Sequence, residues 1–139
     1  MVNIRRIDLR LYTANRSKAG TDGEVYLGMA GREFNIDSTG NDFERGSDRI
    51  YTLGVGANIK RPDNNDPRKP QLKTEDLAKY PVYLRFEPKG SGPNWNLEWL
   101  SATVNPGPSQ IKYENPPLRG SPDIWLGDNY GKIVYLTQV

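Results

Sequence analysis

The sequence predicts an all-β protein, in the form of an eight-stranded antiparallel β-sandwich of two four-stranded sheets. Short runs in which apolar and polar residues alternate predict strands with one buried face. Turn residues separate these runs, since the 139 residues include 14 glycines and 11 prolines. Helical periodicity is almost absent. Two packed sheets bury one face of every strand, and a closed barrel is the alternative arrangement.

Four alternating runs lie in the first half of the chain. In the first run Ile7, Leu9 and Leu11 share one parity, and small and polar residues over 15–23 end the pattern. Gly31 interrupts the next apolar alternation and predicts a turn between two hairpin strands. The strands expected in this half span residues 7–13, 25–29, 34–36 and 50–55.

A polar, proline-rich loop over about 60–80 opens the second half and is longer than most compact domains contain. We interpret it as an ordered excursion packed on the sandwich, with a binding loop as the alternative; only 74–79 can form a helical turn. Further strands are expected over residues 82–86, 95–104, 124–126 and 133–137, with a short segment at 111–113 and Gly/Pro-rich turns at 106–108 and 116–122. The apolar parity slips by one residue near Trp99 and Leu100, which predicts a β-bulge.

Length and composition limit the possible functions. A chain of this length predicts a single domain over 1–139. The sequence contains no His and no Cys, which removes the commonest general base, the thiolate nucleophile and the usual zinc ligands, so no enzyme activity is expected. A net charge of +2 is too small to predict nucleic-acid binding. No apolar run is long enough for a transmembrane segment.

The first six residues lack the apolar core of a secretory signal peptide. The default expectation is therefore a cytoplasmic protein, with peripheral attachment to a membrane as an option. A signal peptide that had been removed would leave the same sequence.

Two segments combine glycine turns with oxygen-bearing side chains. The segment Ala-Gly-Thr-Asp-Gly at 19–23 precedes the second strand, and Asn-Asp-Phe-Glu-Arg-Gly at 41–46 follows the third. If the run between them is a hairpin, both segments return to one end of the molecule. Because Ca²⁺ binds about six to eight oxygen atoms from carboxylates, amides and backbone carbonyls, this convergence predicts a calcium site.

These two segments resemble the PLAT domain, a module shared by polycystins, lipoxygenases, some lipases and alpha-toxin. Family members have a Gly-Thr-Asp turn after the first strand and an Asn-Asp-Phe-Glu-Arg-Gly segment after the next two. The resemblance extends along most of the chain, through Trp-Asn-Leu-Glu at 95–98 to Trp125 and Leu126. It implies a PLAT-like β-sandwich, expected here as a stand-alone domain, and lipid binding as the activity usually associated with the family.

The resemblance also implies a ligand set, because calcium-binding PLAT domains take their ligands from these two loops. The residues carried over are Asp22, Asn41, Asp42 and Glu44, and the backbone carbonyls of 18–20, including that of Gly20, could offer neutral oxygens. Some relatives have a second acidic residue where this chain has Gly23, so weak binding is expected. The alternative is structural, since Gly-Thr-Asp-Gly makes a good turn in any protein and the second segment can hold its loop without metal.

Lipid contact is expected to be electrostatic. PLAT domains that insert into membranes expose apolar residues at loop tips near the calcium site, whereas the tips at 15–18 and 89–94 here are polar or basic. Arg16, Lys18 and Lys89 are the residues expected near anionic head groups, at about 1 kcal/mol each. Without an apolar anchor such binding should be transient and sensitive to salt.

The aromatic residues fall into two groups. The tryptophans lie inside predicted strands and are expected in the core: Trp95, Trp99 and Trp125. Three tyrosines, Tyr12, Tyr26 and Tyr83, take the polar parity of their strands. They are either ordinary outward tyrosines or an exposed patch of the kind that sugar-binding modules use.

The leading functional hypothesis is a non-catalytic, calcium-binding targeting or interaction module that docks onto a lipid surface or a protein partner. The alternative is a metal-independent structural or stress-related domain that binds protein. A small hydrolase with Asp42 and Glu44 as an acid–base pair is disfavoured, because nothing in the sequence resembles an activated nucleophile or an oxyanion hole.

Overall fold

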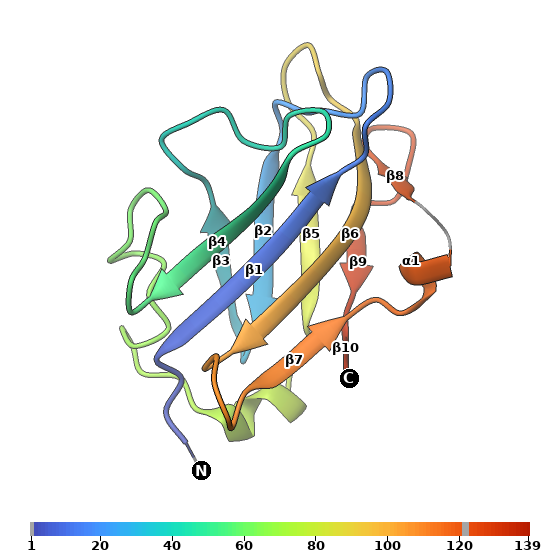
Figure 1. The fold of residues 1–139 in the computed structure, drawn as a ribbon. Coiled ribbons are helices and arrows are strands. Elements are labelled where there is room, and N and C mark those ends of the chain that lie inside the picture. Colours follow the sequence, from blue (N-terminus) through green and yellow to red (C-terminus); the bar gives the residue numbers. More distant parts are fainter. Residues whose placement is uncertain (1, 121–122) are drawn as a thin grey trace.

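The chain folds into an antiparallel β-sandwich (Figure 1). The computed structural model describes residues 2–120 and 123–139. Its strands are β1 (Arg6–Thr13), β2 (Glu24–Met29), β3 (Arg32–Ile36), β4 (Asp48–Gly54), β5 (Tyr83–Glu87), β6 (Trp95–Val104), β7 (Ile111–Glu114), β8 (Ile124–Leu126), β9 (Ile133–Tyr135) and β10 (Thr137–Gln138). Among the described residues, helical structure is confined to the 3₁₀-helix η1 (Thr74–Ala78) and the single turn α1 (Pro117–Gly120). The predicted fold class is confirmed.

The two sheets are unequal, with six strands in one and four in the other. The larger sheet has the order β10-β7-β6-β1-β4, with β8 also paired to β6, and lies in front of the smaller sheet, β3-β2-β5-β9, in Figure 1. The expectation of two four-stranded sheets is therefore wrong in strand count. The reason is that the chain crosses between the sheets at Leu136, whose side chain is buried. The run expected over 133–137 is thereby divided into β9, paired with β5, and β10, paired with β7.

The hydrophobic core lies between the sheets, because the alternating apolar residues of β1, β2 and β5 all face inward. Trp95 is fully buried at its centre, with ring centroids 5.3 Å from Phe43 and 5.6 Å from Phe86. Its indole N–H donates to Thr13 Oγ1 at 2.8 Å, so the one polar atom of the ring has a partner. Trp95 therefore joins both sheets to the second motif segment.

The predicted β-bulge lies on β6. Tyr12 of β1 pairs with Trp99, whereas Thr13 pairs with Leu97, so Glu98 is the extra residue. The slip allows Leu97 and Leu100 to be buried on either side of it.

The proline-rich loop and the two residues before it, 58–59, cover one side of the sandwich. On this side β3 and β4 are the edge strands of their sheets. The Asn58 amide bonds the edge of β4, accepting from the N–H of Thr52 at 2.8 Å and donating to the carbonyl of Ile50 at 2.9 Å. On β3, Asn65 Oδ1 accepts from the N–H of Asn35 at 2.7 Å. These contacts agree with an ordered excursion, since they occupy pairing groups that an edge strand otherwise exposes.

Two expectations extend beyond the described residues. The turn predicted over 116–122 contains α1 but also includes Ser121 and Pro122, and the domain predicted over 1–139 includes Met1 as well. The single-domain assignment stays a prediction. Within the described residues, no helix has the length and apolar character that crossing a membrane requires.

Candidate functional site

Three loops and one turn gather where β1 ends and β2 and β6 begin, at the upper end of Figure 1. This loop end comprises residues 14–23, 37–47, 88–94 and 127–132. The N–H of Thr21 donates to the Phe43 carbonyl at 3.2 Å, and that of Asp22 donates to the Gly92 carbonyl at 3.0 Å. At Gly20 a Cβ would lie 2.9 Å from the backbone of the second loop, so only glycine allows this approach. The expected return of both motif segments to one end is confirmed.

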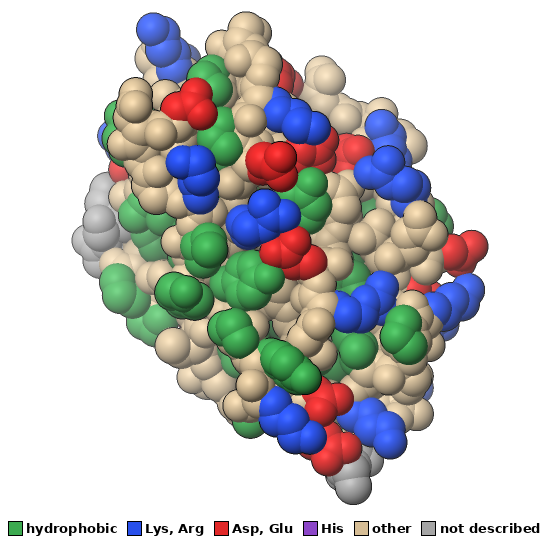
Figure 2. Space-filling view, turned by 180° about the vertical axis from the view of Figure 1, so that it is seen from behind, with side chains coloured by type: hydrophobic (Ala, Val, Ile, Leu, Met, Phe, Trp, Pro, Cys, Tyr) green, Lys and Arg blue, Asp and Glu red, His purple; other side chains and the backbone are tan. Residues whose placement is uncertain are grey.

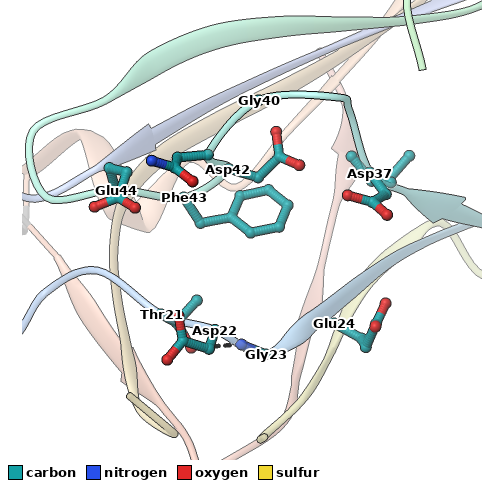
Figure 3. A pocket seen from close by; sticks show the side chains of 11 residues that line it. Thr21, Asp22, Gly23, Glu24, Asp37, Gly40, Asp42, Phe43 and Glu44 are labelled. Atoms are coloured by element: carbon teal, nitrogen blue, oxygen red, sulfur yellow. Dashed lines mark hydrogen bonds between the residues drawn. The ribbon is translucent and has the colours of Figure 1, made fainter. Parts of the chain in front are cut away.

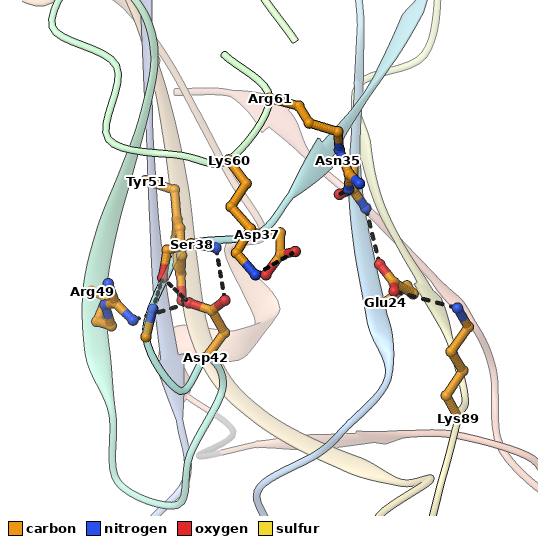
Figure 4. A network of polar contacts seen from close by, with 11 residues as sticks. Glu24, Asn35, Asp37, Ser38, Asp42, Arg49, Tyr51, Lys60, Arg61 and Lys89 are labelled. Atoms are coloured by element: carbon orange, nitrogen blue, oxygen red, sulfur yellow. Dashed lines mark hydrogen bonds and ion pairs between the residues drawn. The ribbon is translucent and has the colours of Figure 1, made fainter. Parts of the chain in front are cut away.

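Asp42, one of the predicted calcium ligands, is the centre of a hydrogen-bond network (Figure 4). Its carboxylate accepts from the N–H and Oγ of Ser38 at 2.8 and 2.6 Å, and from Arg49 and the Tyr51 hydroxyl at 3.0 Å each. Burial acts to raise the pKa of Asp42, but the hydrogen bonds from Ser38 and Tyr51 outweigh it and hold the pKa below its usual value. Both oxygens thus have protein donors, and Asp42 braces the second loop.

The other predicted ligands line two adjoining hollows between the loops, of which Figure 3 shows the smaller. The hollow of about 210 Å³ has Asp22, Asn41, Asp42 and Glu44 on its walls, and that of about 300 Å³ has Gly20, Asp22 and Glu44. Asp22 Oδ2 also accepts from the N–H of Gly92 at 3.2 Å, which ties it to the loop before β6. Asp22 and Glu44 are therefore the two carboxylates shared by both hollows.

Two acidic residues that sequence reasoning missed also line the smaller hollow, Glu24 at the start of β2 and Asp37 just after β3. Burial, together with a hydrogen bond shared with Asp42, raises the pKa of Asp37. A hydrogen bond from Asn35 is the main cause that lowers the pKa of Glu24. Their positions in the sequence could have identified them. Glu24 directly follows the first motif segment, and Asp37 lies between the end of β3 and the second motif segment.

A calcium ion fits this arrangement in part. Ca²⁺ takes about six to eight oxygen ligands, but the Asp42 carboxylate is already occupied by protein donors. Across residues 2–120 and 123–139, no three Asp, Glu, His or Cys side chains group together as metal ligands. A bound ion would rely on Asp22 and Glu44, with backbone carbonyls and water completing its shell. The ligand set stays a prediction.

The three cations expected at a lipid surface have different surroundings. The Arg16 guanidinium lies 2.6 Å from the Asp123 carboxylate, and Lys89 Nζ lies 3.3 Å from Glu24. Lys18 lines the larger hollow beside Asp22 and Glu44. Two of the three are thus ion-paired within the protein, which reduces their attraction for anionic head groups.

A stacked aromatic pair at the loop end was not foreseen. Trp125 of β8 and Tyr130 in the following turn have ring centroids 6.1 Å apart and planes inclined by 25°. Tyr130 is 47% exposed, and Trp125 is only half-buried rather than a core residue as expected. The turn is closed by the Tyr130 N–H, which donates to the Gly127 carbonyl at 3.2 Å, and Gly127 packs on Asn94. Gly127 and Gly131, on either side of this tyrosine, could have predicted an exposed turn from the sequence.

These features define an antiparallel β-sandwich module whose loops form a candidate site at one end. In sequence the chain is 31% identical over 133 residues to phospholipase C of Clostridium haemolyticum, an alignment that covers 91% of this chain and 28% of that protein. No family model matches the chain. The resemblance drawn from the two motif segments is nevertheless confirmed, and the chain has a PLAT-like fold.

Solved structures with the same fold include bacterial toxins and a lipoxygenase. The alpha-toxin of Clostridium absonum superposes with a TM-score of 0.63 at 22% identity over 98% of this chain and 32% of that one. An avian-strain alpha-toxin of Clostridium perfringens gives 0.62 at 20% identity, over 95% and 31% of the two chains. A coral 8R-lipoxygenase, whose calcium activation is ascribed to a C2-like domain, gives 0.58 at 18% identity over 96% and 17%. The chain therefore corresponds to a minor part of each of these proteins.

Proposed function

We propose that this chain is a non-catalytic module that docks peripherally onto lipid surfaces through the loop end. The observation that carries the proposal is the stacked pair of Trp125 and Tyr130. Tryptophan and tyrosine rings favour the membrane–water interface, because each has an apolar body and a polar edge. The pair supplies the apolar contact that the polar tips at 15–18 and 89–94 lack.

The relatives support a lipid ligand. One is a phospholipase C by name, and a lipoxygenase of the same fold was crystallised with arachidonate. Because this chain matches only 28% of the phospholipase C, we transfer from it a lipid-contacting role and no catalytic one.

We further propose that docking depends weakly on calcium. Besides Asp42, four carboxylates line the hollows and repel anionic head groups, those of Asp22, Glu24, Asp37 and Glu44. A Ca²⁺ ion held by Asp22 and Glu44, with the Gly20 carbonyl, the Asn41 amide and water, would cancel this repulsion. Arg16, Lys18 and Lys89 at the rim would then add a salt-sensitive attraction.

Lipid docking is tested by co-sedimentation with vesicles of phosphatidylcholine and phosphatidylserine. Tyr130→Ala should reduce the bound fraction severalfold, because it removes the most exposed ring at the loop end. Val55→Ala is the matched control, since Val55 is 48% exposed just after β4, at the end of that strand opposite to the loop end. Equal binding by Tyr130→Ala and the wild type would contradict the proposal.

The calcium dependence is tested by thermal unfolding in EDTA, in Mg²⁺ and across a Ca²⁺ titration. A ligand present at about one hundred times its dissociation constant adds about 2.7 kcal/mol to the stability of a protein that binds it only when folded. We expect a rise of the midpoint with Ca²⁺ that Asp22→Asn and Glu44→Gln each abolish. A flat response to millimolar Ca²⁺ would remove calcium from the proposal while leaving lipid docking to the vesicle experiment.

A metal-independent protein-interaction domain is the second candidate function. It is favoured by the Asp42 network, in which protein donors rather than a metal hold the second motif loop. The outcome that selects it is an unchanged midpoint in Ca²⁺ together with no vesicle binding.

A further inference from the structure

The outer face of the four-stranded sheet carries tyrosines that the loop end does not use. Figure 2 views the molecule from this side, and hydrophobic side chains gather on the face. At one level of the sheet Gly28, Tyr83 and Tyr135 stand opposite one another on β2, β5 and β9. Tyr135 is 63% exposed, and Ile133, two residues before it on β9, is 46% exposed. This level of the face thus offers tyrosine rings to solvent, beside the ion pair of Glu33 and Arg85.

The ring of Tyr83 lies against the backbone of β2. A Cβ at Gly28 would be 2.1 Å from the nearest ring atoms of Tyr83, so the absence of a side chain at Gly28 makes room for the ring. The Tyr83 hydroxyl donates to Glu33 Oε2 at 2.7 Å, which draws the ring across β2 towards β3. The ring therefore lies along the sheet and offers its other face outward.

A hollow of about 330 Å³ adjoins this ring at the β2–β3 turn. It is lined by Met29, Gly31, Arg32, Glu33, Tyr80, Pro81 and Tyr83. Tyr80 is 51% exposed, and its ring packs against Gly31, where a Cβ would lie 3.0 Å from it. Two tyrosine rings thus border one hollow, which is of the size that small ligands occupy in proteins.

The charged side chains of the hollow already have protein partners. Arg32 donates to the carbonyls of Asn64, Asp66 and Lys69 at 2.7 to 3.1 Å. Glu33 accepts from Arg85 Nε at 2.8 Å and from its terminal nitrogen at 2.9 Å. The hollow consequently suits an uncharged ligand better than an anionic head group or a nucleic acid, both of which need unpaired cations.

From this geometry we propose that the hollow and the tyrosine face bind a neutral saccharide chain. Sugar rings have apolar C–H faces that pack on aromatic rings, and hydroxyl groups at their edges that form hydrogen bonds. The hollow offers both kinds of contact, because polar atoms border its two tyrosine rings. Tyr83 and Tyr80 stack on successive sugar rings, and Tyr135 extends the contact across the sheet to β9. The Tyr80 hydroxyl and the remaining lone pair of Glu33 Oε1 bond sugar hydroxyls. This site is separate from the loop end and does not depend on lipid docking.

The test is a ¹H–¹⁵N NMR titration of the whole chain with cellohexaose, xylohexaose and maltohexaose in turn. At least one of them should shift resonances of β5, β9 and the β2–β3 turn. Tyr80→Ala should weaken that binding about tenfold, as loss of one stacked ring implies. Gly28→Ala should weaken it as well, by displacing the Tyr83 ring. Tyr12→Ala, which changes a tyrosine on the outer face of the other sheet, should bind as the wild type does.

Three results would overturn the proposal. The first is the absence of shifts with all three sugars at millimolar concentration, and the second is shifts that map to the loop end. The third is a dimer by light scattering that Tyr135→Ala converts to monomer, because it would assign the face to a second copy of the chain.

Discussion

At the scale of single residues, Asp42 shows how a side chain of ligand type can serve the fold. Replacing it with Ala leaves the Tyr51 hydroxyl and the Ser38 N–H without their acceptor and removes the carboxylate that pairs with Arg49. We expect Asp42→Ala to lower the free energy of unfolding by about 3 kcal/mol, as is usual when one partner of a buried charged network is removed. Urea unfolding at pH 7 measures the loss. Glu44→Ala, at an exposed carboxylate of the same loop, should change stability by less than about 0.5 kcal/mol.

The pKa of Asp42 makes that contribution depend on acid. Its pKa in the folded state lies below the usual value of 3.8 that the unfolded chain has. The stabilisation is therefore complete above the unfolded pKa and is lost as the pH falls through the folded pKa. The stability gap between the wild type and Asp42→Asn should shrink as unfolding is measured from about pH 5 downwards. A gap that stays constant to pH 2 would show that the ionised carboxylate is not what stabilises the loop.

Asp37 should respond with the opposite sign. Burial raises its pKa, so its contribution to stability is present at low pH and lost as the pH rises through the folded pKa. Asp37→Asn is accordingly the matched control for Asp42→Asn: it should be relatively more stable at neutral pH than in acid. The same acid series measures both variants.

At the scale of elements, the edge strand β4 depends on Asn58. Asn58→Ala removes two hydrogen bonds to the β4 backbone and should destabilise the fold by about 1–2 kcal/mol. It also uncovers pairing groups of an edge strand, so turbidity on heating should begin at a lower temperature. Asn64→Ala is the control, because the bonds of Asn64 in this loop are made by its backbone. Identical turbidity for the two variants would contradict the edge-covering role.

Elements with a clear period could be predicted from the sequence. Alternation of apolar and polar residues was sufficient to predict β1, β2 and β5, and the slip in parity was sufficient to predict the bulge on β6. In a strand with one buried face, successive side chains point in opposite directions, so the pattern shows directly in the sequence. The division of the last strand at Leu136 could not be predicted, since one apolar residue continues the alternation whichever sheet receives it. The local sequence pattern indicates which residues are buried. The sheet to which a strand belongs depends instead on pairing with strands that are distant in the chain.

The candidate site was less predictable for the same reason. That the segments at 19–23 and 41–46 meet follows from a hairpin between them, and it was foreseen. The occupancy of Asp42 was not, because its donors Arg49 and Tyr51 belong to β4, and only the folded chain brings them near. Likewise Trp125 has the local pattern of a core residue, and its exposure follows from a place at the end of the sheet, where little covers it.

At the scale of the whole molecule, the sandwich presents two proposed surfaces on one rigid frame. The loop end gathers at one end of both sheets, whereas the tyrosine face covers the outside of the smaller sheet, as Figures 1 and 2 together show. A membrane bound at the loop end therefore leaves the tyrosine face exposed to solvent at its side. The arrangement suits a module that holds a lipid surface and a saccharide at the same time.

This geometry predicts how the chain stands on a vesicle. Because the sequence contains no cysteine, a single introduced one can carry an environment-sensitive dye without competing sites. Dye on Asn129→Cys, in the turn beside Tyr130, should shift to shorter wavelength when anionic vesicles are added and should be quenched by a quencher attached to lipid. Dye on Ser109→Cys, in the loop between β6 and β7, should do neither, because β6 begins at the loop end and ends at the opposite one. A response from Ser109→Cys alone would place the opposite end on the membrane and exclude Trp125 and Tyr130 as the contact. Asn129 and Ser109 lie at opposite ends of the same sandwich. If the loop end contacts the membrane, the dye on Asn129→Cys must respond and the dye on Ser109→Cys must remain in water.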